Sequence, residues 1–337
     1  MKTKQHFAIG KFIQQNMAWV LLIVVCLIFG LTGEHFFSFR NIVNILNQNA
    51  FVIVASLGLT FLMMSGAIDL SVGWVMSTCS VICAIMMVTL GWPIWVAIPL
   101  TIVISISIAM LNTFISIKLK LQLLVVSIAS MTIFNGISFL FSEARTISGF
   151  SPAFRWIGTG RFLDIPIGVY IAAFFFIIMS FVLNRTHFGR HVYALGGNEE
   201  AARLAGINVK KTRYIIAAIT GFFVGVASIM LISRIGMATS ALGPGTEFVI
   251  ITGVFLGGVS IRGGEGKLSG VLAGILCVSI LYNGMQLAGI NVHYQSIAKG
   301  LILIAAIGFD RYQLNRRNVV KKTKNEPENK EPKGESA

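Results

Sequence analysis

Residues 261–268 read IRGGEGKL and come closest, in this chain of 337 residues, to a phosphate-binding loop. Such a loop needs a glycine, four further residues, and then Gly-Lys followed by serine or threonine, whose hydroxyl binds Mg²⁺. Here Ile261 stands in place of the first glycine, and Leu268 stands in place of the hydroxyl residue. The segment therefore predicts a glycine-rich turn, and any ATP hydrolysis has to take place on another subunit.

The residue types that bind metals or carry out catalysis are scattered. His187 and His191 have the spacing of four that metal ligands use on a helix. Gly189 lies between them in a basic loop, however, so we expect a solvent-exposed helix face and not a metal site. The four cysteines lie within apolar runs, without a set of histidines or acids beside them: Cys26, Cys79, Cys83 and Cys277. We expect no metal, no disulfide and no cofactor, and a membrane enzyme is the least favoured class.

A short polar segment, GGNEEAARLAGI at 196–207, has the marks of a helix with defined ends. Asn198 can cap its first turn, and the following two glutamates lie where the helix dipole favours negative charge. Gly206 can adopt the left-handed conformation that stops a helix. The resulting helix, 199–205, is about 10 Å long and too short to be stable alone. Leu204 and Ile207 are its only large apolar residues, so docking to a cytoplasmic protein is favoured over a bilayer-surface helix.

The composition predicts an integral membrane protein, since 55% of the residues are hydrophobic, 12% are charged and the mean hydropathy is +0.80. Soluble domains carry about a quarter of their residues as charged types. The net charge of +14 does not indicate a nucleic-acid partner, because most basic residues lie between apolar runs or in the last 27 residues.

Ten apolar segments of spanning length predict an all-α, polytopic membrane protein. They lie at 17–33, 48–65, 72–91, 93–117, 121–142, 165–184, 214–233, 247–261, 268–288 and 294–310. With both termini in the cytoplasm, 21 basic residues fall inside, five outside and one in the last span, which satisfies the positive-inside rule. We therefore expect a cytoplasmic N-terminus (1–16), a transmembrane domain (17–310) with a cytoplasmic loop at 185–213, and a disordered cytoplasmic tail (311–337).

Four motifs together give the chain a family resemblance: FFSFRNIVNIL at 36–46, MSGAIDLSVG at 64–73, GGNEEAARLAGI at 196–207 and GGVSIRGGEGKLSGVLAG at 257–274. In this order they resemble the permease subunits of bacterial ribose-type sugar ABC importers, from about residue 35 to 310. The resemblance implies a bacterial inner-membrane location and import of a monosaccharide. It also implies three partners: a second permease subunit, two ATP-binding subunits or one tandem ATPase, and an external sugar-binding protein.

The resemblance also assigns the polar loop segment to a coupling helix, which docks into the ATP-binding subunit. The residues assigned to it are Gly197, Asn198, Glu199, Glu200, Ala201, Ala202, Arg203, Leu204 and Gly206.

Two glycine-broken segments, at 64–73 and 260–270, each interrupt a pair of apolar runs on the cytoplasmic side. Freed backbone groups at membrane depth have to be satisfied by protein or by water. Laying 51–73 over 248–270 matches six of the 23 positions, a weak internal repeat of the kind from which transporters are built. If the repeat is real, the two breaks flank a common pathway, whereas the alternative is that the glycines only allow close helix packing.

A pathway for a neutral sugar should be polar but mostly uncharged. The candidate pathway and helix-break residues are Gly66, Asp69, Ser71, Gly73, Asn112, Asn135, Glu247, Gly263, Gly264, Asn283 and Gln286. Each polar residue within a span can equally form a bond between helices, and Asp69 can equally cap the turn that begins near Ser71. Ion-coupled carriers place ionisable residues within their spans. Here only Lys299 lies within a predicted span, which makes a secondary transporter the weaker alternative.

The chain also departs from the family pattern. Residues 121–131, LQLLVVSIASM, lack the proline that such permeases commonly have before the fifth span, and GTEFVIITG at 245–253 replaces an acidic-apolar-Asp-Ala-Ile-Ala-Ala pattern. These differences leave the particular sugar undetermined.

Overall fold

A computed structural model describes residues 17–32 and 36–325, with side chains described up to residue 308. The predicted cytoplasmic N-terminus, 1–16, lies outside the described residues.

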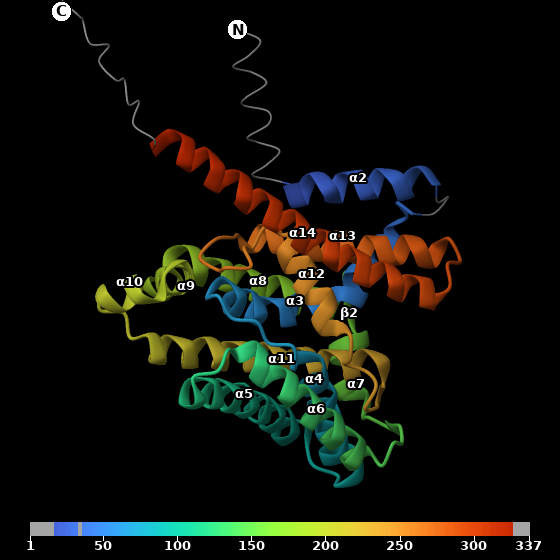
Figure 1. The fold of residues 1–337 in the computed structure, drawn as a ribbon. Helices are drawn as coiled ribbons and strands as arrows, with labels where there is room; N and C mark the ends of the chain where they lie inside the picture. Colours follow the sequence, from blue (N-terminus) through green and yellow to red (C-terminus); the bar gives the residue numbers. More distant parts are fainter. Residues whose placement is uncertain (1–16, 33–35, 326–337) are drawn as a thin grey trace, which may run out of the picture.

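Apolar helices make up most of the described chain (Figure 1). Seven are long and apolar enough to cross a membrane: α3 (Phe39–Met64), α4 (Val72–Ala84) with the π-helical turn η1 (Ile85–Thr89), α5 (Ile94–Leu119), α6 (Leu123–Ser142), α8 (Ile167–Arg185), α11 (Val209–Ile235) and α13 (Leu268–Leu287). Three more have shorter apolar stretches: α2 (Met17–Thr32), α12 (Thr246–Leu256) and α14 (Val292–Asn325). The prediction of an all-α polytopic protein is confirmed.

The remaining elements are short and lie near the ends of the long helices. They are α7 (Pro152–Thr159), α9 (His187–Gly197) and α10 (Glu199–Leu204), with β1 (Ile147–Ser148) paired antiparallel to β4 (Met237–Ala238) and β2 (Arg161–Phe162) paired to β3 (Ile165–Pro166). Figure 1 shows α9 and α10 at one end of the bundle and α7 at the other. We call these the α10 end and the α7 end.

Two helices differ from the predicted spans for local reasons. The span predicted at 48–65 is the second half of α3, which begins at Phe39 because the Ser38 side chain caps it by accepting the Asn41 N–H. Its first half contains several asparagines and therefore has a low hydropathy. The span predicted at 247–261 ends at Leu256, because Gly258 and the glycines after it adopt left-handed backbone conformations.

The last helix is longer than predicted. We expected an unstructured tail from residue 311, whereas α14 continues to Asn325. The reason is local, because 311–325 contains no glycine or proline and several lysines and arginines, which are good helix formers. Residues 326–337 lie outside the described part.

Helix α11 forms the centre of the bundle, between α3 and α5. Close approach of backbones makes this possible: a Cβ on Gly58 would lie 2.6 Å from Thr220 Cα, and a Cβ on Gly221 would lie 2.6 Å from Ile106 Cα. The Thr220 hydroxyl donates to the Gly58 carbonyl across the α3–α11 contact at 3.1 Å. In α3 and α11, 72% of the apolar 18-residue stretch that could span a membrane is buried. In α5, α6 and α8 the buried share is 22%, so the exposed faces of these helices are left for lipid or another subunit.

Replacing Gly221 with alanine should destabilise the protein, because the added methyl group has only backbone to displace. We expect a cost of about 1–3 kcal/mol, the usual range for overpacking, seen as a lower thermal unfolding midpoint in detergent. Gly136→Ala is the matched control, because no atom lies within 4 Å of a Cβ at that exposed position of α6. It should be neutral or slightly stabilising, and equal midpoints for the two variants would contradict the close α11–α5 contact.

Candidate functional site

Helix α10 has both of the predicted ends. The Asn198 side chain accepts the Ala201 N–H at 3.0 Å, and Gly206 adopts a φ of +84°. The turn is closed by Ile207 N–H, which donates to the Ala202 carbonyl at 3.0 Å. The helix spans Glu199–Leu204, one residue less than predicted, and Leu204 at its C-terminus is 80% exposed. The helix therefore presents an apolar tip that nothing in the described chain covers.

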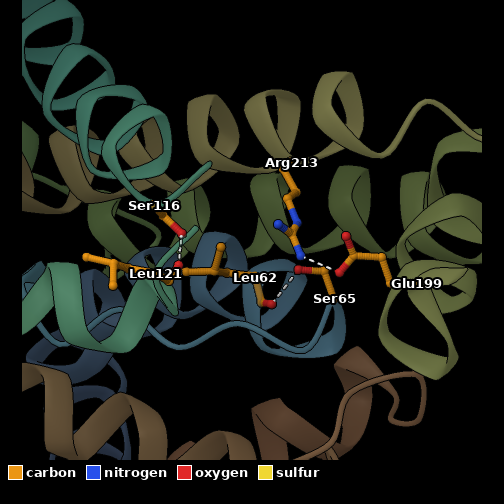
Figure 2. A network of polar contacts seen from close by, with 6 residues as sticks. All are labelled: Leu62, Ser65, Ser116, Leu121, Glu199 and Arg213. Atoms are coloured by element: carbon orange, nitrogen blue, oxygen red, sulfur yellow. Dashed lines mark hydrogen bonds and ion pairs between the residues drawn. The ribbon is translucent and has the colours of Figure 1, made fainter. Parts of the chain in front are cut away.

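An ion pair joins α10 to the start of α11. Arg213 Nη2 lies 2.5 Å from Glu199 Oε2 (Figure 2). The same figure draws the hydrogen bond that the Ser65 hydroxyl donates to the Leu62 carbonyl at the end of α3. Within α10, Arg203 pairs with Glu200. These side chains are substantially exposed, so each pair adds only about 0–1 kcal/mol. The pair to Arg213 links α10 directly to a spanning helix.

The two glycine-broken segments meet at the α10 end. The Met64 carbonyl, at the end of α3, accepts the Gly264 N–H at 2.8 Å. A Cβ on Gly263 would lie 2.6 Å from Gly66 N. Backbone groups freed by one break are thus satisfied by the other, as they must be within a membrane protein. From the weak repeat we predicted that the two breaks flank a common pathway; the structure brings the breaks into direct contact, and the pathway stays a prediction.

The C-terminal end of α9 completes this contact. A Cβ on Gly196 would overlap both Met64 O and Gly264 N, so only glycine fits there, and a Cβ on Gly264 would lie 2.7 Å from Gly197 Cα. We call this meeting of three chain segments the glycine junction; its residues are Met64, Gly66, Gly196, Gly263 and Gly264.

Side chains of α9 also hold it against the membrane helices. The Tyr193 hydroxyl donates to the Gly266 carbonyl at 2.8 Å, beside the glycine junction. Burial raises the pKa of Tyr193 above its ordinary value near 10, so this donor keeps its proton at neutral pH. The Phe188 ring stacks on Phe61 of α3 at 6.1 Å. Helix α10 is therefore connected to the glycine junction through α9, which it directly follows.

A second predicted group gathers at the break between α3 and α4. Ser71 donates to Asp69 Oδ1 through both its N–H, at 2.7 Å, and its hydroxyl, at 2.6 Å. Asn112 of α5 donates to the Ser71 hydroxyl at 3.2 Å, and Ser127 of α6 accepts the Leu70 N–H at 3.0 Å. The side chain of Asp69 thus orders the turn before α4, which is the structural alternative, and it also lines a small cavity with Asn112.

Two other predicted residues are in contact although they are far apart in sequence. A Cβ on Gly73, in α4, would overlap the carboxylate of Glu247. Glu247 is buried in the first turn of α12, where its carboxylate accepts the Gly245 N–H at 3.0 Å. Gly73 therefore makes room for a buried acid.

The remaining predicted pathway residues do not join these groups. Asn283 of α13 exchanges two amide hydrogen bonds with Asn41 of α3, at 3.1 and 3.2 Å, which is the interhelical role. Asn135 is half-buried in α6 and Gln286 is exposed on α13. The two histidines that have helical spacing lie on α9, where His187 contacts Arg190. Within the described residues, no group of three or more potential ligands could hold a metal ion.

Sequence reasoning missed Gly196 and Tyr193, although both are in or beside the quoted loop. A signal was present, because glycine inside a helix costs about 1 kcal/mol relative to alanine and therefore needs a packing reason. Nothing local in the sequence, however, indicates that the packing partners are Met64 and Gly264.

Comparison with known proteins places the chain among transport permeases. A family model described as "Branched-chain amino acid transport system / permease component" matches residues 41–307. The ribose import permease protein of Haemophilus influenzae is 35% identical over 91% of this chain and 96% of its own length. The L-arabinose transport system permease protein of Escherichia coli is 32% identical over 94% and 96%, and the ribose import permease protein of Bacillus subtilis is 34% identical over 86% and 90%. No solved structure matches.

Gly196→Ala should loosen the glycine junction, because the methyl group has to break or stretch the Met64–Gly264 hydrogen bond. We expect a loss of about 1–3 kcal/mol, together with faster amide exchange of 257–267 measured by mass spectrometry. Gly197→Ala is the control, since nothing lies within 4 Å of its Cβ. If exchange of this segment were the same in both variants, the proposed closeness of α9 to the two breaks would be wrong.

Proposed function

The chain belongs to the family of branched-chain amino acid transport system permease components, and from its similarity to ribose and arabinose permeases we propose that it carries a monosaccharide of the ribose, galactose or xylose kind. It is the permease subunit of an ABC importer, a multi-pass inner-membrane protein and not an enzyme. The observation that supports a sugar as the substrate is the 30–35% identity to ribose and arabinose permeases over nearly the whole chain.

In this proposal, energy for transport comes from separate ATP-binding subunits, as the assignment to an ABC importer implies. The near match to a phosphate loop at 261–268 lacks the first glycine and the hydroxyl, so it does not supply an ATPase site. We propose an assembly of two permease subunits, as a homodimer or with a paralogue, two ATP-binding subunits or one tandem ATPase, and one external sugar-binding protein. One chain offers one α10, whereas ATP-binding subunits of such importers act in pairs. Lipid surrounds the apolar faces.

The α10 end faces the cytoplasm in this proposal, with both termini on the same side. Basic residues support the orientation, since ten of those described outside α14 lie at this end and five lie at the α7 end. Those at the α10 end are Lys118, Lys120, Arg185, Arg190, Arg203, Lys210, Lys211, Arg213, Arg262 and Lys267.

Helix α10 is the element proposed to dock in a cleft of the ATP-binding subunit, through residues 197–204 and Gly206. Its exposed tip, Leu204, supplies an apolar contact, and the Glu199–Arg213 pair transmits a force on α10 to α11. The path through α9 leads to the glycine junction, where α3 and the segment before α13 meet. We propose that the junction closes the pathway at this end and that movement of α9 opens it.

Reconstitution tests the function directly. Proteoliposomes are made with this permease and its ATP-binding subunits, with ATP in the lumen that the α10 end faces and the loaded binding protein outside. They should accumulate D-ribose, L-arabinose, D-xylose or D-galactose only when ATP is present in the lumen. Omitting any one component should abolish uptake. Uptake by the permease alone, driven by an ion gradient, would replace the proposal with the secondary-transporter alternative.

The coupling role predicts a selective defect. Leu204→Asp should weaken association with the ATP-binding subunit at least tenfold and abolish transport, with normal membrane abundance, because the exposed residue contributes nothing to the fold of the permease. Leu163→Asp is the control, since Leu163 is 77% exposed at the α7 end. Association is measured by co-purification and titration in detergent.

Two further variants test the ends of α10 in the same assay. Gly206→Val strains the left-handed turn by about 1 kcal/mol or more, and Glu200→Lys reverses a charge at the helix start. Both should assemble poorly and lose transport. Wild-type assembly and transport at normal abundance would instead support a bilayer-surface helix.

A further inference from the structure

The β-hairpin at the α7 end, formed by β2, β3 and the turn between them, has an apolar tip. Phe162 pairs with Ile165 across the two strands, so Leu163 and Asp164 form the turn. The Phe162 residue is 59% exposed and Leu163 is 77% exposed. Removing apolar surface from water is favourable, so two adjacent large apolar residues at the tip of a hairpin indicate a contact outside the chain.

The backbone of this turn makes a leucine there still less expected. Leu163 has a φ of +48° and Asp164 a φ of +61°, both left-handed, as a type I′ turn requires. Such a turn favours asparagine, aspartate and glycine, because the Cβ of other residues approaches the following carbonyl oxygen. Asp164 follows this preference and Leu163 does not. A strained residue that is also apolar and exposed points to a function of its side chain.

The hairpin is attached to the first turn of α8. The Ile167 N–H donates to the Gly160 carbonyl at 2.9 Å, which closes the base of the hairpin. The Tyr170 hydroxyl donates to the Phe162 carbonyl at 2.9 Å, and the two rings meet edge to face with their centres 6.0 Å apart. The position of the tip is therefore tied to a membrane helix.

The tip continues an exposed stripe of α8. Tyr170, Phe174, Ile177 and Phe181 recur at intervals of four, three and four residues, which places them on one face of the helix, and all four are exposed. Contacts between membrane helices favour small residues such as glycine, alanine and serine, whereas this stripe contains only large ones. The stripe is therefore better suited to lipid than to another subunit, and Phe162 extends it beyond the start of α8.

Other residues at this end suit the boundary between acyl chains and headgroups. Trp156 of α7 is exposed, and so is Trp95 in the first turn of α5, a helix that packs in one apolar cluster with α7. Tryptophan and tyrosine are enriched at this boundary in membrane proteins. The exposed charges of Arg161 and Asp164 flank the apolar tip, and they limit how deeply it can enter the hydrocarbon.

We propose that the β2–β3 hairpin is a lipid anchor, in which Phe162 and Leu163 contact phospholipid acyl chains just below the headgroups of the leaflet at the α7 end. In the proposed orientation this is the outer leaflet. The anchor holds the connection between α6 and α8, residues 143–166, at the membrane surface. The inference depends on the membrane location of the chain and not on the transported sugar, so its test needs no transport.

A spin label at residue 163 tests the contact. The permease is prepared with its four cysteines replaced by alanine, labelled at Leu163→Cys, and placed in nanodiscs of phosphatidylethanolamine and phosphatidylglycerol. Electron paramagnetic resonance compares access of oxygen, which concentrates in lipid, with access of a water-soluble nickel chelate. Ile177→Cys on the α8 stripe is the lipid-facing reference. Thr146→Cys, exposed beside the Arg145–Glu143 ion pair, is the water-facing reference.

The ratio of oxygen access to chelate access should be about threefold or more higher at 163 than at 146, and close to the ratio at 177. A ratio at 163 equal to that at 146 would place the tip in water and overturn the anchor. Shielding of 163 from both reagents would assign the tip to a second permease copy. Shielding that begins only when the loaded binding protein is added would assign it to that protein. Wild-type association with the ATP-binding subunits in detergent checks the fold of each labelled protein.

Leu163→Asn tests the side chain without a label or cysteine replacement. Asparagine fits the left-handed turn better than leucine, so in water the variant would slow amide exchange of 160–167. We expect faster exchange in the same nanodiscs, measured by mass spectrometry, because the lipid contact is lost. Asp164→Asn is the matched control, since it introduces the same residue at the neighbouring left-handed position without removing an apolar side chain. It should leave exchange unchanged or slower, and the same result for Leu163→Asn would overturn the proposal.

Discussion

The fold depends on satisfying backbone groups where helices are broken inside a membrane protein. Carbonyl and amide groups that a break frees and that packing shields from water need partners elsewhere in the protein. The Met64 carbonyl and the Gly264 amide meet this need for each other. Their approach requires that no side chain stand between them, which is why glycines gather at this point from three distant parts of the chain. The same requirement brings α9, and with it α10, against the membrane helices.

The sequence predicted those features that depend on neighbouring residues. Asn198 and Gly206 mark the ends of α10 through interactions spanning three or four residues, and the apolar runs mark the ten helices. The start of α3 was not predicted, because its asparagines lower the hydropathy. One of them, Asn41, forms hydrogen bonds with Asn283 of α13. The contact between the two breaks could be predicted only as a shared region, because its geometry depends on how distant helices pack.

In the candidate site, too, the residue types could be predicted from the sequence, whereas contacts that depend on distant segments could not. Asp69, Ser71 and Asn112 were each identified as polar residues in apolar surroundings, and the structure joins them in one hydrogen-bonded group. Gly196 was overlooked because its role depends entirely on backbone atoms of other segments. Arg234 was counted only as one of five basic residues on the outer side, since nothing near it in sequence reveals that its side chain lies half-buried beside the Phe51 ring.

The contact between Gly58 and Thr220 limits how α3 and α11 can move. The close backbones and the Thr220 hydrogen bond oppose rotation or sliding of one helix against the other at this contact. At 1.5 Å per residue, Met64 lies about 9 Å from this contact and Asn47 about 16 Å on the other side. If the two helices tilt together about this contact, a displacement at the glycine junction becomes a larger, opposite displacement at the far end.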